Sequence, residues 1–273
     1  MNNPVTDINT PELLEAVINI AEAAAREILD VYETEFNVDN KEDHSPLTAA
    51  DMAAHKLICR KLAELTPAIP ILSEESADIP YATRQTWQRY WLVDPLDGTR
   101  EFIKRNGEFT VNIALIDQHK PVLGVVQVPV KHICYYAAEG VGAYKRELSK
   151  TISLRVKQTT TGIFKVAGSR SHGSEKQMKF IEQLGSNIEL MAIGSSLKFC
   201  LVAEGLVDIY PRFGPTSEWD TAAAQCIVEQ AGGSVTDIAL IPLRYNTRES
   251  LLNPEFLVIA DKNFDWQPYL KRI

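Results

Sequence analysis

The segment Asp94-Pro95-Leu96-Asp97-Gly98 follows the short apolar run 90–93 and carries two aspartates on a tight turn. Proline fixes φ and cannot extend a strand's hydrogen bonds, and glycine permits a positive φ and a close approach of the backbone to a ligand. Two carboxylates with the Leu96 carbonyl between them are hard oxygen ligands that suit Mg²⁺. Asp, Pro and Gly are also ordinary turn residues, so the spacing alone leaves a plain turn open.

Three further acids stand at the ends of expected elements. Glu74 and Glu75 end the apolar run 69–72, and Asp220 begins an Ala-rich segment that we expect to be a helix. The two glutamates also fit a solvated face, and Asp220 also fits the preference of acids for a helix N-terminus. The N–H groups after Gly98 suit a phosphate oxygen if a helix starts at Thr99. The spacing of these acids along the sequence does not by itself show that they meet in the fold.

Composition narrows the class of protein. The 273 residues are 45% hydrophobic and 23% charged, which is typical of a soluble globular protein. No run approaches the roughly 18 apolar residues of a membrane span, and residues 1–10 lack the pattern of a signal peptide. The net charge of −8 argues against a nucleic-acid polymer as partner. A small anionic substrate would need a bound cation or a local basic pocket.

The four cysteines are far apart and form no C-x-x-C pair. Their spacing favours neither a zinc site nor a disulfide framework. We expect buried free thiols in the reducing cytoplasm.

The first half of the chain predicts two helices followed by strands. The first helix begins at Thr10-Pro11 with apolar residues at helical spacing through Leu29, and a capping box at Thr48–Asp51 begins the second, which runs through Leu65. A polar loop over 37–45 separates them. The expected strands are 69–72, 90–93, 111–116, 122–128, 132–138 and 141–144.

The second half alternates strands with helices. Strands are expected over 164–167, 188–193, 207–210 and 256–260, and helices after 172–174 and over 195–203 and 220–230. The mixture predicts a layered α/β (α+β) architecture. We expect one catalytic domain over 10–273, with halves of about 10–150 and 151–273 that meet at the polar segment 146–162.

Two motifs resemble the signatures of the inositol monophosphatase superfamily. They are W-L-V-D-P-L-D-G-T-R-E-F-I-K at 91–104 and W-D-T-A-A-A-Q-C-I-V-E-Q-A-G-G at 219–233. The resemblance covers nearly the whole chain. Within the superfamily, E-F-I-K-R-N-G-E-F-T-V-N-I-A-L-I and Y-P-R-F-G-P-T are most similar to the bacterial bisphosphate nucleotidases. The resemblance implies an αβαβα sandwich of the inositol monophosphatase/fructose-1,6-bisphosphatase type and a Mg²⁺-dependent phosphomonoesterase.

The resemblance also implies roles for the acids. Glu74 and the Leu96 carbonyl match ligands of a first metal, Asp94 matches a bridging ligand, and Asp97 and Asp220 match ligands of a second metal. Two Mg²⁺ ions about 3.5–4 Å apart would stabilise the attacking and leaving oxygens of an in-line displacement. Such ions would let a protein of charge −8 bind a multiply anionic substrate.

Other matched residues handle the phosphate and the water. The segment Leu96–Thr99, Gly98 included, matches the part that holds the scissile phosphate, and Glu74 and Thr99 would orient the attacking water. Asp51 matches an acid that supports the threonine hydroxyl and the metal site. A capping role for Asp51 with Thr48 is the rival explanation.

Basic and hydroxyl residues of the second half suggest a site for a second phosphate. Ser169, Ser195 and Lys198 each follow an expected strand, and Arg212 stands where inositol-specific relatives carry an acid. Lys198 also fits a solvated helix lysine. His172 on its own does not indicate a substrate site, because a structural histidine fits the position equally well.

The leading hypothesis is hydrolysis of the 3′-phosphate of adenosine 3′,5′-bisphosphate to AMP, with the sulfated nucleotide PAPS as a second substrate, a role in sulfur assimilation and inhibition by Li⁺. The alternatives are an inositol- or sugar-phosphate phosphatase and, remotely, a phosphate-binding module without turnover. The resemblance leaves a monomer or a homodimer open. It also implies possible peripheral attachment to the inner membrane, for which the sequence offers no amphipathic anchor.

Overall fold

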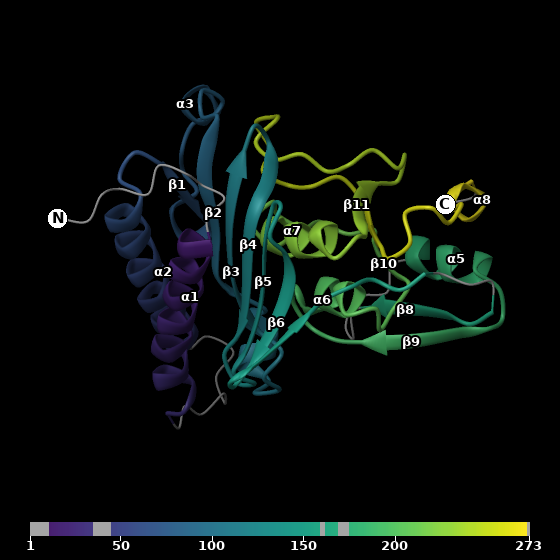
Figure 1. Cartoon of the computed structure of the whole chain (residues 1–273), viewed down its shortest axis with the longest axis horizontal. Helices are drawn as coiled ribbons and strands as arrows, with labels where there is room; N and C mark the ends of the chain where they lie inside the picture. The colour runs from purple at the N-terminus through teal and green to yellow at the C-terminus, as the bar shows by residue number, and fades with distance from the viewer. Residues whose placement is uncertain (1–10, 35–44, 159–161, 169–174, 272–273) are drawn as a thin grey trace.

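A computed structural model of the chain describes residues 11–34, 45–158, 162–168 and 175–271. Helices and sheets alternate in five layers, as the resemblance implied (Figure 1). The order is a helix pair, a seven-stranded sheet, a second helix pair, a five-stranded sheet and two short outer helices. No helix in the described part of the chain is long and apolar enough to cross a bilayer.

The outer helix pair consists of α1 (Pro11–Tyr32) and α2 (Ser45–Leu65). The apolar stripe of α1 is buried, Leu13 and Ile18 fully so, and it packs against the sheet. The prediction that a capping box begins the second helix at Thr48 is wrong. The helix begins at Ser45-Pro46, where proline suits the first turn, and Thr48 is an exposed residue one turn further on.

The first sheet is a meander that starts with one parallel pair. Strand β1 is parallel to β2, and each later strand is antiparallel to its predecessor. Both faces are covered by helices, so the strands read as near-continuous apolar runs. The strands are β1 (Ile71–Ser73), β2 (Arg89–Asp97), β3 (Thr110–Asp117), β4 (Lys120–Val128), β5 (Ile133–Ala138), β6 (Gly142–Glu147) and β7 (Lys150–Ser153).

Two expectations about this sheet need correction. The second strand does not end at Asp94: the pairing with β3 is interrupted by a register shift between Asp94 and Asp97, and this bulge accommodates Pro95. No strand was expected in the polar segment 146–162, yet Lys150–Ser153 pairs with β6 as an exposed edge strand. The polar composition of this strand fits an edge. The role of the segment as a boundary between halves stays a prediction.

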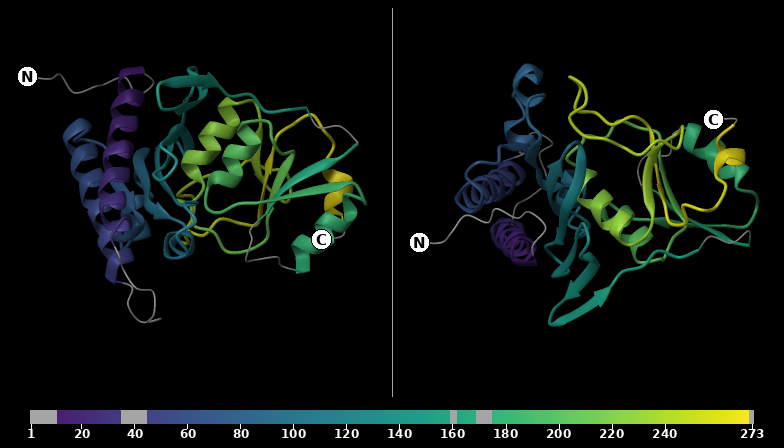
Figure 2. Two further views of the ribbon diagram at one scale, coloured as in Figure 1. Left: turned by 90° about the horizontal axis from the view of Figure 1, so that it is seen from below. Right: turned by 45° about the horizontal axis from the view of Figure 1, so that its top comes forward.

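The middle layer joins the two sheets. Helices α6 (Leu197–Ala203) and α7 (Ala222–Gln230) lie between them (Figure 2). A Cβ at Gly124 of β4 would overlap the Ala223 carbonyl, so this glycine lets α7 approach the sheet closely.

The second sheet has the order β11-β12-β10-β8-β9. The strands are β8 (Phe164–Gly168), β9 (Ile188–Ala192), β10 (Ile209–Arg212), β11 (Ser234–Asp237) and β12 (Phe256–Ile259). Helices α5 (Glu175–Gln183) and α8 (Gln267–Leu270) lie on its outer side, and Phe180 and Trp266 are buried against it. Short segments η1 (Glu74–Ser76), α3 (Tyr81–Arg84) and α4 (Thr99–Ile103) complete the fold.

Candidate active site

The aspartate turn forms the bulged end of β2. Asp94 is buried, and its Oδ1 accepts a hydrogen bond of 3.0 Å from the Leu96 N–H. Gly98 has a φ of 97° and is the N-cap of α4, which begins at Thr99 as the sequence suggested. The left-handed backbone at Gly98 therefore turns the chain from a strand directly into a helix start.

Parallel pairing brings Glu74 to this turn. Ser73 is the register partner of Val93, so the next residues along the two strands, Glu74 and Asp94, are neighbours. The Ser73 hydroxyl is held by a 2.9 Å hydrogen bond with His55 Nδ1 of α2. As a whole residue, Glu74 is exposed at the edge of the site, but its carboxyl group is partly buried. That burial, together with the charge of Asp97, raises the pKa of the carboxyl group.

Asp220 reaches the same place from the second half of the chain. It lies in a turn two residues before α7, rather than within the helix as expected. Carboxylate oxygens of Asp94, Asp97 and Asp220 lie within 4.8 Å of one another. Among the described residues Glu74 is not part of this group, so the structure brings together three of the four predicted acids and places the fourth beside them.

One oxygen of each clustered carboxylate is already held by a backbone N–H. The Leu96 N–H donates to Asp94 Oδ1 at 3.0 Å. The Ser196 N–H donates to Asp97 Oδ2 at 2.7 Å, and the Ser217 N–H donates to Asp220 Oδ2 at 2.9 Å. These bonds fix the side chains and leave the second oxygen of each carboxylate for another partner.

Burial and mutual repulsion make the cluster hard to ionise without a cation. Burial, and then neighbouring carboxylates, raise the pKa of Asp97 to about 7 and that of Asp220 to about 6. The pKa of Asp94 is raised well above its usual value for the same reasons. Oxygen donors of this kind, close together and poor in compensating charge, fit divalent magnesium.

Asp51 lies behind the glutamates. It is buried on α2, and burial together with the charge of Glu75 raises the pKa of its carboxyl group to about 8. Its Oδ1 has no hydrogen-bond partner among the described residues. The expected support of the Thr99 hydroxyl by Asp51 stays a prediction.

A cavity of about 150 Å³ adjoins the carboxylates. Its lining includes the acids Asp97 and Asp220 and the cationic residues Lys198 and Arg212, together with Gly98 and Ser195. The exposed-lysine alternative is wrong: Lys198 is buried, and its Nζ donates to the Ser195 carbonyl at 2.7 Å. Burial lowers the pKa of Lys198 to about 8.

The remaining predicted substrate residues differ in placement. The Arg212 guanidinium donates to Thr216 Oγ1 at 2.8 Å and faces the same cavity. Ser195 Oγ lies 2.9 Å from the Asp97 carbonyl oxygen and 2.7 Å from that of Glu108, and its one hydrogen is shared between these acceptors. This contact ties Ser195 to the aspartate turn. Thr99 is exposed at the start of α4. Ser169 and His172 lie outside the described residues.

Comparison with known proteins agrees with this geometry. The model of the inositol monophosphatase family matches residues 9–263. The chain belongs to this family. It is 52% identical over 248 residues to the 3′(2′),5′-bisphosphate nucleotidase CysQ of Salmonella typhimurium, a match that covers 90% of this chain and 99% of the relative.

Solved structures give the same family and fold. CysQ of Bacteroides thetaiotaomicron, described as a bacterial member of the inositol monophosphatase family, superposes with a TM-score of 0.86 at 43% identity over 94% of this chain and all of that one. An inositol monophosphatase of Zymomonas mobilis superposes with a TM-score of 0.77 at 23% identity over 95% of this chain and 96% of that one, which shows the shared fold. Family enzymes are metal-dependent, and the acidic cluster suits that property.

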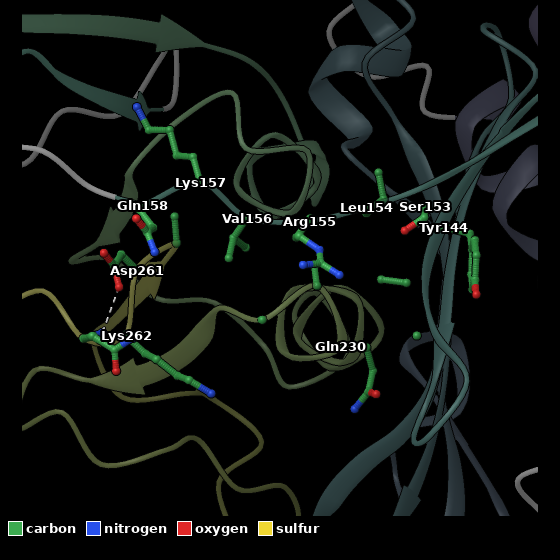
Figure 3. Close-up of a pocket in the computed structure, with 16 residues that line it drawn as sticks. Tyr144, Ser153, Leu154, Arg155, Val156, Lys157, Gln158, Gln230, Asp261 and Lys262 are labelled. Carbon is green, nitrogen blue, oxygen red and sulfur yellow. Dashed lines mark hydrogen bonds between the residues drawn. The ribbon is translucent and has the colours of Figure 1, made fainter.

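A larger cavity, of about 450 Å³, lies at the other end of α7 (Figure 3). It is lined by β6, residues 153–158, the end of α7 and the segment after β12. Arg155 lies over the end of α7, whereas Lys157 points away because its Nζ pairs with Asp208 at 2.7 Å. The carboxylate cluster is not part of this cavity, so size alone does not locate the active site of this family member.

Sequence reasoning missed several polar residues beside the cluster. Glu108 accepts a 2.9 Å hydrogen bond from the Gly194 N–H, and Ser196 donates to Asp97. Thr110 and Asn112 are fully buried neighbours of Ser196. The available signal was the polar alternation Glu108, Thr110, Asn112 at the start of an otherwise apolar strand.

Proposed function

We propose that this chain is a Mg²⁺-dependent 3′(2′),5′-bisphosphate nucleotidase that removes the 3′-phosphate of adenosine 3′,5′-bisphosphate to give AMP and phosphate. The observation that carries the proposal is the juxtaposition of an acidic cluster with a cavity that contains two cationic side chains, Lys198 and Arg212. The names of the CysQ relatives at 52% and 43% identity support it. PAPS, which carries the same 3′-phosphate, is the second substrate.

The residues divide into two groups by role. Glu74, Asp94, Asp97, Asp220 and the Leu96 carbonyl would hold two or more Mg²⁺ ions. When bound, these ions supply positive charge and an activated water for an in-line displacement at phosphorus. The protein places the scissile phosphate on the backbone from Leu96 to Thr99, at the start of α4.

The water is oriented by Glu74 and the Thr99 hydroxyl, and Asp51 supports the metal site from α2. Glu74 suits this role because it lies at the edge of the cluster, and burial of its carboxyl group, then the charge of Asp97, raises the pKa of that group. A group with that environment can accept a proton from a water molecule more readily than an ordinary glutamate.

The second phosphate occupies the cavity beside α6. Lys198 and Arg212 there offer an ammonium and a guanidinium, and Ser195 also lines the cavity. The expected contact of Ser169, which lies outside the described residues, stays a prediction. Phosphate would replace the two backbone carbonyls that Lys198 Nζ contacts at 2.7 and 3.3 Å as its principal partner. The division of roles follows the proposed halves of the domain: residues 10–150 supply most metal ligands, and residues 151–273 supply Asp220 and the substrate contacts.

Three properties complete the proposal. Li⁺ inhibits by competing for a cation site among the carboxylates. The enzyme works in the cytoplasm, which suits its four free cysteines, and clears a by-product of sulfur assimilation. It acts as a monomer or a homodimer.

The test is phosphate release with Mg²⁺ from adenosine 3′,5′-bisphosphate, inositol 1-phosphate and fructose 1,6-bisphosphate, each with and without Li⁺. We expect kcat/KM for the nucleotide to exceed the others by about 100-fold or more, which corresponds to about 2.7 kcal/mol of differential transition-state binding. A preference for either sugar-like ester would keep the phosphatase chemistry and overturn the nucleotide assignment. Activity that survives exhaustive chelation would overturn the metal mechanism.

A further inference from the structure

A polar network runs from β3 to the aspartate turn and takes no part in the roles above. Thr110 Oγ1 lies 2.9 Å from Ser196 Oγ, and Ser196 Oγ donates to Asn112 Oδ1 at 2.9 Å. All three residues are at most 2% exposed. Water cannot substitute for these partners, so each hydrogen must be assigned within the network.

The assignment fixes the orientation of the Asn112 amide. The Ser196 hydroxyl has one hydrogen, which it donates to Asn112 Oδ1, and it accepts in turn from the Thr110 hydroxyl. The Asn112 Nδ2 group, with two donors, then faces the other way. It is buried and has no hydrogen-bond partner among the described residues.

The unpartnered amide faces the acidic cluster. Asn112 is the register partner of Asp94 across β2 and β3, beside the bulge that ends at Asp97. The network that holds Asn112 also reaches Asp97: the Ser196 N–H donates to Asp97 Oδ2 at 2.7 Å, and Thr110 Oγ1 lies 3.5 Å from the same oxygen. A buried donor beside a carboxylate ligand stabilises both the ionised form and one rotamer of that ligand.

We propose that Asn112 is a positioning residue for the metal centre, with its amide orientation set by Ser196 and its buried, unpartnered Nδ2 available as a donor to the carboxylate ligands of that centre. This inference rests on the proposed function, because it concerns the ligands of the same centre. The network also joins the two halves of the domain: Asn112 and Thr110 belong to the first sheet, and Ser196 is the N-cap of α6. Closure of the halves therefore sets the geometry of Asp97.

The test compares Asn112→Leu, which keeps the side-chain size and removes the donor, with Gln127→Leu as matched control. Gln127 is also a buried amide, on the adjacent strand β4, and lies beside Cys134 below α1, away from the carboxylates. Mg²⁺ binding is measured by calorimetry on the substrate-free full chain, and thermal unfolding checks that each variant folds.

We expect Asn112→Leu to weaken Mg²⁺ binding by about tenfold or more, as loss of a residue that orients a metal ligand does, and Gln127→Leu to leave it within twofold. The Mg²⁺ concentration for half-maximal activity should rise in parallel while KM for the nucleotide at saturating Mg²⁺ stays unchanged. An unchanged Mg²⁺ affinity in folded Asn112→Leu, or an equal loss in both variants, would overturn the proposal.

A second variant keeps the test decisive if Asn112→Leu does not fold. Ser196→Ala retains the backbone N–H to Asp97 and removes only the hydroxyl that orients the amide. It should weaken Mg²⁺ binding about threefold or more, and no change would equally overturn the proposal. Calorimetry measures Mg²⁺ binding without any turnover of substrate. If the wild-type chain bound Mg²⁺ but hydrolysed no bisphosphate, the proposed function would be contradicted, and the comparison of Mg²⁺ affinities would still test Asn112.

Discussion

At the scale of single residues, the proposed active site is a set of acids whose backbone hydrogen-bond partners are already in place. Asp94, Asp97 and Asp220 each accept one main-chain hydrogen bond, from Leu96, Ser196 and Ser217 respectively. One oxygen of each of the three carboxylates lies within 4.8 Å of the others. Cation binding therefore requires little rearrangement of the protein, which is the arrangement that gives a metal site its affinity.

Asp94→Asn tests the central ligand. The change keeps the shape of this buried side chain and removes its charge, so we expect kcat/KM to fall by more than about a thousandfold, or about 4 kcal/mol of transition-state stabilisation. The variant should fold, because loss of a charge next to other acids relieves repulsion. Phosphate release and thermal unfolding are measured beside Asp117→Asn, which breaks only a half-exposed ion pair with Arg89. Near-normal turnover of Asp94→Asn would exclude it as a ligand.

Lys198→Ala tests the second-phosphate contact. An ammonium bound to phosphate contributes about 1.5–3 kcal/mol, so kcat/KM for the bisphosphate should fall ten- to a hundredfold more than that for a nucleoside monophosphate. Lys165→Ala removes an exposed lysine paired with Glu189 and is the control. Equal losses on both substrates would remove Lys198 from the phosphate site.

The pH dependence of KM gives an independent check on Lys198. Its pKa is lowered by burial to about 8, so the side chain is charged below that pH and loses its charge above it. We expect KM for the bisphosphate to rise from pH 7.5 to 9 in the wild type. In Lys198→Ala the rise over this range should be absent. A rise of the same size in both proteins would assign it to another group.

At the scale of secondary-structure elements, the site depends on how strand ends meet helix starts. Periodicity predicted α1, β3, β4, β5 and α7 to within three residues at each end, because each has many apolar positions that pack on one face or in one core. The sequence also identified the three clustered acids as candidate metal ligands, since they follow a strand or precede a helix. Their spacing did not show that they meet, because the pairing of β1 with β2 and the approach of Asp220 are tertiary features. Only the family resemblance implied that they share a metal site.

The errors at this scale have local causes. The helix start at Ser45 was misplaced because Thr48 and Asp51 imitate a capping box inside the helix. The prediction ended strand β2 before Pro95, because proline cannot complete the strand's hydrogen bonds. The strand continues to Asp97, since a β-bulge places Pro95 where no such bond is needed. The polar network of Thr110, Asn112 and Ser196 was missed because each of these residue types is common at its position in a strand or at a helix start. Only the fold shows that they contact one another.

Gly98→Ala tests the strand-to-helix turn. The residue has a φ of 97°, and an added Cβ would overlap Ser195 Oγ and crowd Phe109. We expect the variant to lose about 1–3 kcal/mol of unfolding free energy and most of its activity, because the phosphate-binding backbone must shift. Gly140→Ala is the control: its φ of 80° gives similar backbone strain, but no atom lies within 4 Å of its added Cβ. Chemical denaturation and kinetics should show a cost in stability alone for Gly140→Ala, and equal activity in the two variants would contradict the role of the turn.

At the scale of the whole molecule, the two sheets close on a shared layer of helices, and the acidic cluster lies where they meet. Asp94 and Asp97 come from the first sheet, whereas Asp220 and Ser196 come from the segments that lead into α7 and α6. Folding therefore concentrates negative charge where the first sheet meets the segments that precede α6 and α7. The unfolded chain has no such concentration, so stability and proton binding are linked.

The sign of that linkage gives a prediction for the metal-free protein. The folded state raises the pKa of Asp97 from 3.8 to about 7 and that of Asp220 from 3.8 to about 6, so it binds more protons than the unfolded state between about pH 4 and 7. The stabilisation that this proton binding provides is present at low pH and is lost as the pH rises through the folded values. In EDTA, the melting temperature should therefore be lower at pH 8 than at pH 6. Mg²⁺ binds the ionised cluster, so it should raise the melting temperature more at pH 8 than at pH 6. Asp94→Asn, with one fewer acid in the cluster, should show a smaller fall in EDTA, and a wild-type melting temperature that stays level or rises with pH would refute this account.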